Sequence, residues 1–146
     1  MKKLLFLLIF ASATLFTFAA PPVNEKVLKL FSSVFPTVQN AKWYEYEDYY
    51  QVYFDKDDIK CRIKYDFDGK IISTMRYYGD KMVSPFLRAK LSQKHPEKTI
   101  YGVTETNSDS ELTYDFVLED DKGWMHVRSD ATGQMSVTKK FKKSAE

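Results

Sequence analysis

The side chains that most often carry out chemistry are few in this sequence, and they lie far apart along the chain. It contains two histidines, His95 and His126. His95 precedes Pro96, a residue type that ends helices, and His126 stands alone between two apolar residues. A metal site or a catalytic triad needs several convergent partners, so we do not expect the histidines to share a site. There is also no Gly-x-Ser-x-Gly motif and no glycine-rich phosphate loop. We therefore predict no catalytic residues and a protein that is not an enzyme.

Two acidic segments have some of the features of a calcium site. The segment Asp66-Phe67-Asp68-Gly69 resembles a fragment of a calcium loop, and residues 55–58 add further carboxylates. Calcium takes roughly six to eight oxygen ligands, and the longer loop that ends in a bidentate glutamate is missing. We interpret the segment as a glycine-assisted hairpin turn in which aspartates accept hydrogen bonds from their own backbone. The segment 130–133 has a threonine where the first has its second aspartate. We expect no metal and no cofactor.

The first residues have the pattern of a secretory signal peptide. Lys2 and Lys3 precede an apolar run, and small residues follow up to Ala19 and Ala20, before two prolines. The run is short for a transmembrane helix, which needs about 20 apolar residues. We predict cleavage after Ala19, which makes residues 1–19 a signal peptide and residues 20–146 one domain. Because no cysteine lies near this site, we expect an exported protein, periplasmic or secreted to the surface, that is not a lipoprotein and meets the membrane only before cleavage.

Charge and cysteine content narrow the choice of partners. The loss of Lys2 and Lys3 lowers the 22 basic residues to 20, which equals the 20 acidic residues. Nucleic-acid binding normally requires a strongly positive surface, so we do not expect a nucleic-acid partner. The single cysteine, Cys61, excludes an internal disulfide bond. Its neighbours place it on the apolar side of a strand, where we expect a buried thiol.

The expected elements follow the same series twice. Apolar residues recur at helical spacing from Val27 to Phe35, and four β-type runs follow, at residues 41–47, 50–55, 59–65 and 71–78. A second helix begins at Ser84 and ends at His95, and four more strands follow. We predict an α+β fold of two tandem repeats, about 24–78 and 82–141, each a helix packed on one face of a four-stranded antiparallel sheet. The sequence leaves open whether the two sheets join.

The residues that end the first helix and those that form the next strands and turn resemble a known family. The first helix ends in Phe35-Pro36, Trp43 follows, and a strand Tyr50 to Phe54 precedes the segment Tyr65-Asp66-Phe67-Asp68-Gly69-Lys70. This pattern resembles the PepSY-like family of secreted Bacteroidetes proteins, which is described as similar in fold to the β-lactamase-inhibitor protein. The resemblance spans about residues 24–141. It implies a periplasmic or surface-exposed module, and relatives that carry the PepSY name have been linked to peptidase inhibition.

The sheet face that the helices leave uncovered is the candidate site. Tyrosine, tryptophan and arginine often anchor protein interfaces, because they bury a large area and keep a polar group. We therefore predict a protein-binding face and, in a narrower form, an enzyme inhibitor. The residues expected on this face are Tyr44, Tyr46, Tyr49, Tyr53, Lys60, Arg62, Lys64, Arg76 and Tyr78 in the first unit, and Trp124, His126 and Arg128 in the second.

Other interpretations of the sequence stay open. Cross-strand tyrosine pairs and lysine stems also stabilise an exposed sheet without binding anything. A glycan would use the same aromatic side chains. A hydrolase of unfamiliar type is conceivable on carboxylates such as Glu45 and Asp115. A structural or chaperone-like surface protein would instead use open strand edges to pair with other strands. The partner's identity and the oligomeric state cannot be read from the sequence.

Overall fold

The protein is an α+β structure of two helices and eight strands. The structure is a computed structural model that describes residues 23–108 and 111–143, so the expected signal peptide, residues 1–19, lies outside the described residues. The helices are α1 (Glu25–Val34), α2 (Pro85–Lys94) and a short 3-10 helix, η1 (Asp80–Met82). The strands are β1 (Lys42–Glu45), β2 (Tyr50–Lys56), β3 (Ile59–Tyr65), β4 (Ile71–Tyr78), β5 (Thr99–Ser108), β6 (Glu111–Glu119), β7 (Gly123–Asp130) and β8 (Met135–Lys142).

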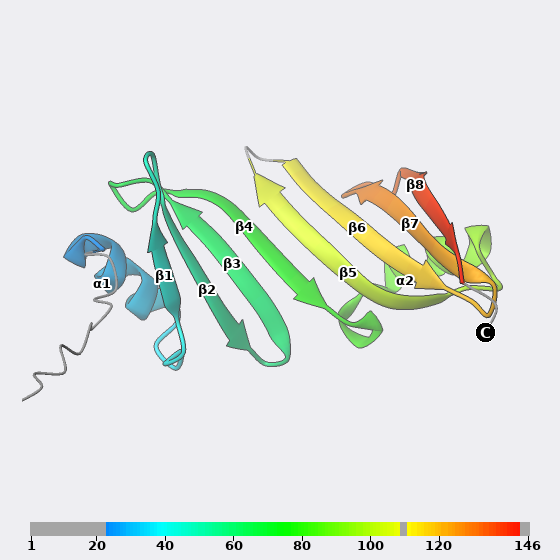
Figure 1. The fold of residues 1–146 in the computed structure, drawn as a ribbon, viewed down its shortest axis with the longest axis horizontal. Coiled ribbons are helices and arrows are strands. Elements are labelled where there is room, and N and C mark those ends of the chain that lie inside the picture. Colours follow the sequence, from blue (N-terminus) through cyan, green and yellow to red (C-terminus); the bar gives the residue numbers. More distant parts are fainter. Residues whose placement is uncertain (1–22, 109–110, 144–146) are drawn as a thin grey trace, which may run out of the picture.

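All eight strands form one antiparallel sheet in which each strand pairs with its neighbours in the sequence (Figure 1). Strands β4 and β5 are paired from Ser73 opposite Ser108 to Tyr78 opposite Val103. This pairing answers the question that the sequence left open, because the first four strands and the last four are continuous. The sheet is open, and its two edges are β1 and β8.

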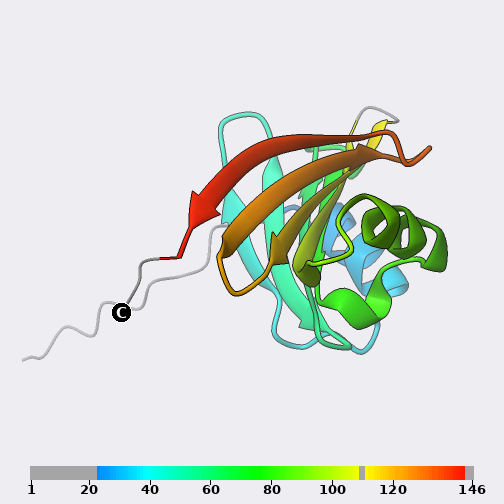
Figure 2. The ribbon, with the colours of Figure 1, turned by 90° about the vertical axis from the view of Figure 1, so that its right-hand side faces the viewer.

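Both helices lie on the same face of the sheet, as the view along it shows (Figure 2). Val27 and Phe31 of α1 are buried in one core cluster with Val52 and other residues of β2 and β3. Leu87 and Leu91 of α2 are buried in a second cluster, together with residues of β4 to β7. Burial of each such side chain contributes about 1.5–3 kcal/mol, so the helices are held mainly by these contacts. The opposite face carries no helix among the described residues, and we call it the open face.

Both helices begin and end with the signals that the sequence contains. The Asn24 side chain accepts a hydrogen bond from the backbone N–H of Lys26 at 2.8 Å, and the Ser84 hydroxyl accepts one from the N–H of Leu87 at 3.3 Å. Pro85 occupies the first turn of α2, where its missing N–H costs nothing. The C-cap residues are Phe35 in α1 and His95 in α2, and each directly precedes a proline. These local signals fix the helix positions before any packing is considered.

Candidate functional site

The open face displays most of the residues that the sequence singled out. Val52 and Ile63 are buried toward α1, so the alternate residues of the same strands face the other way. Strand β7 behaves likewise, because Met125 and Val127 are buried toward α2. Tyr46 belongs to the turn between β1 and β2, outside either strand. The residues placed on the open face are Tyr44, Tyr53, Lys60, Arg62, Lys64, Trp124, His126 and Arg128.

The expectation that Arg76 and Tyr78 lie on the open face is wrong. Arg76 is paired in register with Cys61 and with Glu105, on the helix side of the sheet, and Tyr78 is 4% exposed within the α2 core. The cause is a bulge at the start of β4. Lys64 lies opposite Ser73 while Tyr65 lies opposite Ile71, so one extra residue reverses the expected alternation. Neither side chain is available to a partner on the open face.

Arg76 and Tyr78 instead join β4 to β5 on the helix side. The Tyr78 hydroxyl donates a hydrogen bond to Glu105 Oε2 at 2.7 Å. The Arg76 guanidinium lies 3.4 Å from Glu105 Oε1 and packs over the Tyr78 ring at 5.3 Å. Burial, followed by the hydrogen bond to Glu105, raises the pKa of Tyr78 well above its ordinary value. The phenol therefore stays protonated and acts as a donor at the junction between the two halves of the sheet.

Tyrosines form a fixed layer over the first half of the open face. The rings of Tyr44 and Tyr53 meet edge to face, with centroids 5.6 Å apart. Beneath them Gln51 is only 3% exposed, and its side-chain amide donates a hydrogen bond to the Tyr53 hydroxyl at 2.6 Å. Tyr46 and Tyr49 stack at 4.7 Å in the adjoining turn. These contacts hold the rings in place before anything binds, which lowers the entropy cost of an interface.

Strand β3 adds three cations beside this layer. Lys60, Arg62 and Lys64 occupy alternate positions on the open face. Among the described residues, none of the three has a carboxylate within ion-pair distance. Lys64 instead places its ammonium group 4.5 Å from the centre of the Tyr49 ring. This half of the face therefore carries positive charge that the described part of the chain does not neutralise.

The second half of the open face is different, because its charged groups are paired. Asp115 accepts two hydrogen bonds from Arg128, at 2.8 and 3.2 Å, and the pairing raises the pKa of Arg128. Trp124 packs edge to face against Tyr101 at 5.0 Å. Lys143 lies over the Trp124 ring and bonds a glutamate of β6. Arg128 and Trp124 thus contribute to a surface whose charges already have partners.

Two further aromatic side chains on this face were missed by the sequence analysis. Tyr77 lies over Gly102, where an added Cβ would come within 2.7 Å of the tyrosine hydroxyl. Tyr101 is 56% exposed and follows a register shift in β5. Glycine inside a strand often marks such a close approach, so the Tyr-Gly pair at 101–102 was the available signal.

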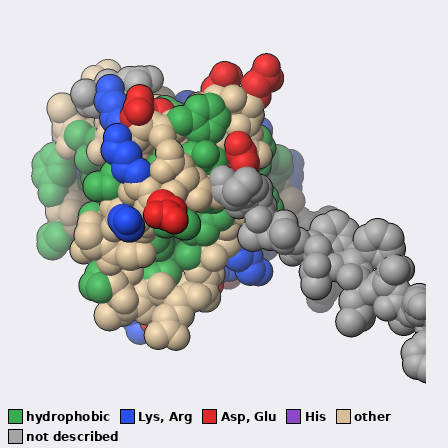
Figure 3. All heavy atoms as spheres, turned by 90° about the vertical axis from the view of Figure 1, so that its left-hand side faces the viewer, with side chains coloured by type: hydrophobic (Ala, Val, Ile, Leu, Met, Phe, Trp, Pro, Cys, Tyr) green, Lys and Arg blue, Asp and Glu red, His purple; other side chains and the backbone are tan. Residues whose placement is uncertain are grey.

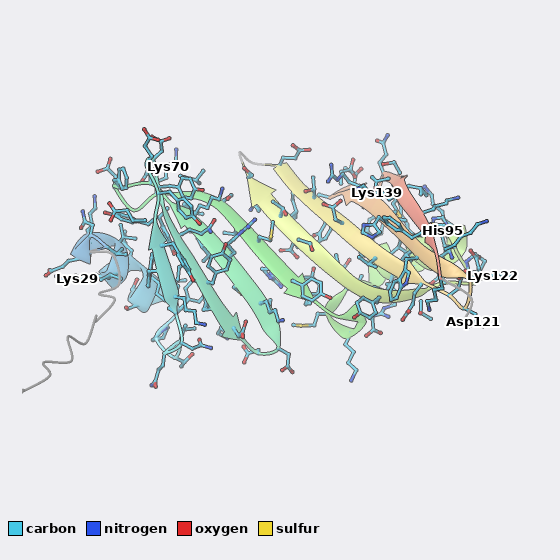
Figure 4. The ribbon with its side chains drawn as sticks, in the orientation of Figure 1. Lys29, Lys70, His95, Asp121, Lys122 and Lys139 are labelled. Carbon is cyan, nitrogen blue, oxygen red and sulfur yellow. The ribbon has the colours of Figure 1, made fainter. Side chains whose placement is uncertain are left out.

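The groups needed for catalysis do not converge among the described residues. Glu45 lies on β1 and Asp115 on β6, five strand spacings apart, which is roughly 24 Å. Carboxylates that act together in glycoside hydrolysis are about 5–10 Å apart. No group of three His, Cys, Asp or Glu side chains that could hold a metal occurs in residues 23–108 and 111–143. His95 lies at the far end of the molecule from Lys29 of α1 (Figure 4).

The acidic turns use their aspartates for backbone hydrogen bonds. Asp66 Oδ1 accepts bonds from the N–H groups of Asp68 and Lys70, at 3.0 and 2.8 Å. Asp130 does the same in the equivalent turn of the second half. Gly69 and Gly133 have φ values of 90° and 78°, a conformation that glycine adopts without strain. The turn interpretation accounts for these carboxylates.

A groove on the helix side contains the single thiol. It has a volume of about 410 Å³ and lies between α1 and the junction of β3 with β4. Cys61 is half-buried in its wall, and burial is the main cause that raises the pKa of this thiol. A raised pKa keeps the thiol protonated and weakens it as a nucleophile. The residues lining the groove are Phe35, Phe54, Lys56, Asp57, Ile59, Cys61, Ile63, Thr74, Met75 and Arg76.

Solved structures with the same architecture exist. A BLIP-like protein from Bacteroides fragilis superposes with a TM-score of 0.62 at 11% identity, over 86% of this chain and 91% of that chain. A DUF2874 family protein from Bacteroides uniformis gives a TM-score of 0.59 at 12% identity, over 82% and 88% of the two chains. The chain has a BLIP-like fold. No protein-family model matches the sequence, and no curated protein matches it.

The BLIP-like fold confirms the part of the resemblance that concerned architecture, while membership of the PepSY-like family stays a prediction. A third solved structure, from Bacteroides eggerthii, superposes with a TM-score of 0.61 at 11% identity over 83% and 89% of the chains, and its description provisionally calls it periplasmic. In the described part of this chain, neither helix has the length and apolar character needed to cross a bilayer.

Proposed function

We propose that this chain is an exported, non-catalytic binding module that engages a protein partner through its open face. The observation that carries the proposal is the tyrosine layer of Tyr44, Tyr46, Tyr49 and Tyr53, which is held by ring contacts and by the buried Gln51. Large rigid aromatic side chains and arginine are enriched in protein interfaces.

The proposal of a non-catalytic role is supported by the chemistry of the available groups. The carboxylates of Glu45 and Asp115 are too far apart to act together, and Asp115 is occupied by Arg128. Burial raises the pKa of the Cys61 thiol, which lowers its reactivity as a nucleophile further. A narrower form of the proposal is that the partner is an enzyme of the cell envelope and that binding inhibits it.

Export and internal repetition belong to the same proposal. The basic and apolar residues of 1–19 support export, and the provisional periplasmic description of the Bacteroides eggerthii protein agrees with it. We infer that residues 24–78 and 82–141 are two copies of one unit. Each contains a capped helix, four strands and a core cluster of its own, with turns at Gly69 and Gly133 that have the same hydrogen bonds.

A pull-down from envelope extract of the source organism tests the binding face. The bait variants are the wild type and the triple variant Tyr44→Ala, Tyr53→Ala, Arg62→Ala. A matched control changes three exposed residues of the helices, Lys29→Ala, Leu30→Ala and Phe86→Ala. We expect a specific partner to be recovered by the wild type and the control and lost by the open-face variant. Equal recovery of every protein by all three baits would contradict the proposal.

A second candidate function uses the edges of the sheet. Strands β1 and β8 each have only one strand neighbour, so both edges can accept another strand. A structural or chaperone-like protein would exploit such edges. Lysines on β8 and a register shift between β7 and β8 count against spontaneous pairing, because both features are known to blunt sheet edges. Size-exclusion chromatography over a range of concentrations tests this candidate, since edge pairing with a second copy would increase the apparent mass.

A further inference from the structure

The three cations of β3 form a row with a regular spacing. Lys60, Arg62 and Lys64 are alternate residues of one strand, so their side chains leave the same face about 6.6–6.8 Å apart. An extended peptide that lies along β3 repeats its own side chains with the same spacing. A partner segment with a carboxylate at every second residue would therefore meet all three cations at once.

None of the three cations of the row has an ion-pair partner among the described residues, and the same holds for Lys139, Lys140 and Lys142 of β8. Elsewhere Arg76 is paired with Glu105, Lys98 with Asp120 and Arg128 with Asp115. The single carboxylate that faces the row from β2 is Asp55, opposite Lys60 in register, and these two residues do not form an ion pair. Neighbouring cations repel one another, so carboxylates of a ligand would relieve that repulsion as they bind.

The flanks of the row indicate what else the ligand must carry. Tyr53 of β2 lies beside Arg62 on one side, and Met75 of β4 lies beside it on the other. Tyr77 lies beside Lys60. The cations are thus bordered by aromatic and apolar side chains, which suit a polypeptide with mixed side chains better than a polymer that is charged throughout.

We propose that this row binds an extended acidic segment of the partner protein, with aspartate or glutamate at alternate positions. The inference rests on the proposed function, because it names the chemistry of the partner at the same face. A second copy of the chain fits less well, since Asp115 and Glu119 on the open face are already paired with Arg128 and Lys143. A nucleic acid also fits less well, because the formal net charge of the whole chain is only +2.

Binding of synthetic peptides tests the spacing directly. The probe is a fluorescein-labelled peptide of alternating glutamate and threonine, about ten residues long so that it spans the length of β3. A second peptide has the same composition but carries its glutamates in pairs separated by two threonines, so that no two carboxylates occupy alternate positions on one side of the extended chain. A third replaces glutamate by glutamine. Fluorescence anisotropy at about 0.02 M salt, where screening is weak, gives the dissociation constants.

The protein variants locate the binding site. The triple variant Lys60→Gln, Arg62→Gln, Lys64→Gln removes the row, and Lys139→Gln, Lys140→Gln, Lys142→Gln removes the same charge from β8. Lys139 lies at the opposite end of the sheet from the row (Figure 4), so the second variant is a matched control. We expect the alternating peptide to bind the wild type and the control alike, and to bind the row variant about tenfold more weakly.

Charge reversal guards against a trivial loss of folding. The variant Lys60→Glu, Arg62→Glu, Lys64→Glu should lose the alternating glutamate peptide and gain binding of an alternating lysine–threonine peptide. Equal affinity for the alternating peptide and the peptide with paired glutamates overturns the proposal, as does equal loss in the β8 variant. Tighter binding of a single-stranded oligonucleotide, or of a second copy detected as a dimer by sedimentation, would also overturn it.

The outcomes separate this inference from the proposed function. Suppose that the Tyr44→Ala, Tyr53→Ala, Arg62→Ala bait loses its partner while the row variant with glutamines retains it. The open face would then bind a protein without using the row, and only the present inference would fail. If the Tyr44→Ala, Tyr53→Ala, Arg62→Ala bait instead recovers every partner, the proposed function fails, and the present inference fails with it.

Discussion

Tyr78 donates its hydrogen bond to Glu105 across the junction of the two halves of the sheet. The donor is buried and the acceptor is a carboxylate that also faces Arg76, so the bond is stronger than an exposed one. The same site shows how burial decides the chemistry of a residue. A tyrosine expected at a binding face serves instead as a buried structural donor to Glu105, and burial raises its pKa further.

We expect Tyr78→Phe to lower the free energy of unfolding by about 1–2 kcal/mol, because Glu105 loses a charge-assisted hydrogen bond while the ring remains. Urea unfolding followed by circular dichroism measures the change. Tyr114→Phe is the matched control, since Tyr114 packs against the same core without a side-chain hydrogen bond in the described residues. A change of less than about 0.5 kcal/mol in the Tyr78 variant would contradict the assignment.

Asp120 gives a prediction about pH. Its pairing with Lys98, helped by hydrogen bonds from two backbone N–H groups, lowers its pKa to about 2, from an ordinary value of 3.8. The folded protein therefore keeps this carboxylate ionised where the unfolded chain already binds a proton. The stabilisation is complete above about pH 4 and is lost as the pH falls toward about 2.

We expect Asp120→Asn to remove that component. Between about pH 4 and about pH 2 the unfolding free energy of the wild type should fall more steeply than that of the variant. Urea midpoints measured at a series of pH values give both curves. Asp121→Asn, in the same turn, is the control and should follow the wild type. Parallel curves for Asp120→Asn and the wild type would refute the role of this pair.

At the scale of elements, close backbone packing holds β8 against β7. A Cβ added at Gly123 would lie 2.1 Å from the carbonyl oxygen of Phe141, which belongs to the backbone and cannot rotate away. Gly79 is the opposite case, because an added Cβ there meets nothing within 4 Å. The two glycines look alike in the sequence and differ completely in what surrounds them.

We expect Gly123→Ala to destabilise the protein by at least about 2 kcal/mol, because β7 and β8 must move apart. Gly79→Ala should change stability by no more than about 0.5 kcal/mol. Thermal unfolding of both variants decides the matter, and amide hydrogen exchange in β8 should speed up in the first variant alone. Similar stability of the two variants would show that the strands are less tightly joined than described.

Local sequence signals predict where the helices and strands lie. They do not always predict which face of the sheet a side chain occupies. The helices could be predicted because capping is a short-range effect. Each begins after a capping residue, Asn24 or Ser84, and each ends at a residue that precedes a proline. In β4 both alternating sets contain apolar residues, and the extra residue Ile72 shifts the register. No pattern in the sequence reports such a bulge, so Arg76 and Tyr78 were assigned to the wrong face. Tyr44, Tyr53 and Arg62 lie on strands with clear alternation, and the structure places them on the open face.

At the scale of the molecule, the pairing of β4 with β5 joins the two halves, each with its own core cluster, in one continuous sheet. Edge-to-edge pairing depends on backbone groups, which every sequence has, so it could not be predicted from side-chain types. Mixed charges and hydrophobic side chains also cover the end of the molecule formed by β1 and α1 (Figure 3). A formal net charge of +2, summed over the chain, does not reveal that three cations of β3 lie in a row without ion-pair partners among the described residues.

The two tryptophans test whether the halves unfold together. Trp43 packs against the α1 core, and Trp124 lies near the other edge of the sheet. The variants Trp43→Phe and Trp124→Phe each leave one fluorescent reporter. We expect coincident unfolding transitions in both variants, corrected for their stability by circular dichroism, because the backbone pairing of β4 with β5 and the bonds to Glu105 couple the cores. Separate transitions would show two independently stable halves.

The order of the strands has a consequence for how the chain reaches this structure. Every strand pairs with the one just before it, and within each half of the sheet the connections are short loops that close onto an edge that already exists. The longer connection between β4 and β5, residues 79–98, contains η1 and α2. Assembly can proceed by successive addition from the amino terminus, without waiting for distant segments to meet. A chain that emerges gradually with its amino terminus first would thus acquire the first half of its sheet at the pace of its own emergence, and short-range closure of this kind favours rapid folding.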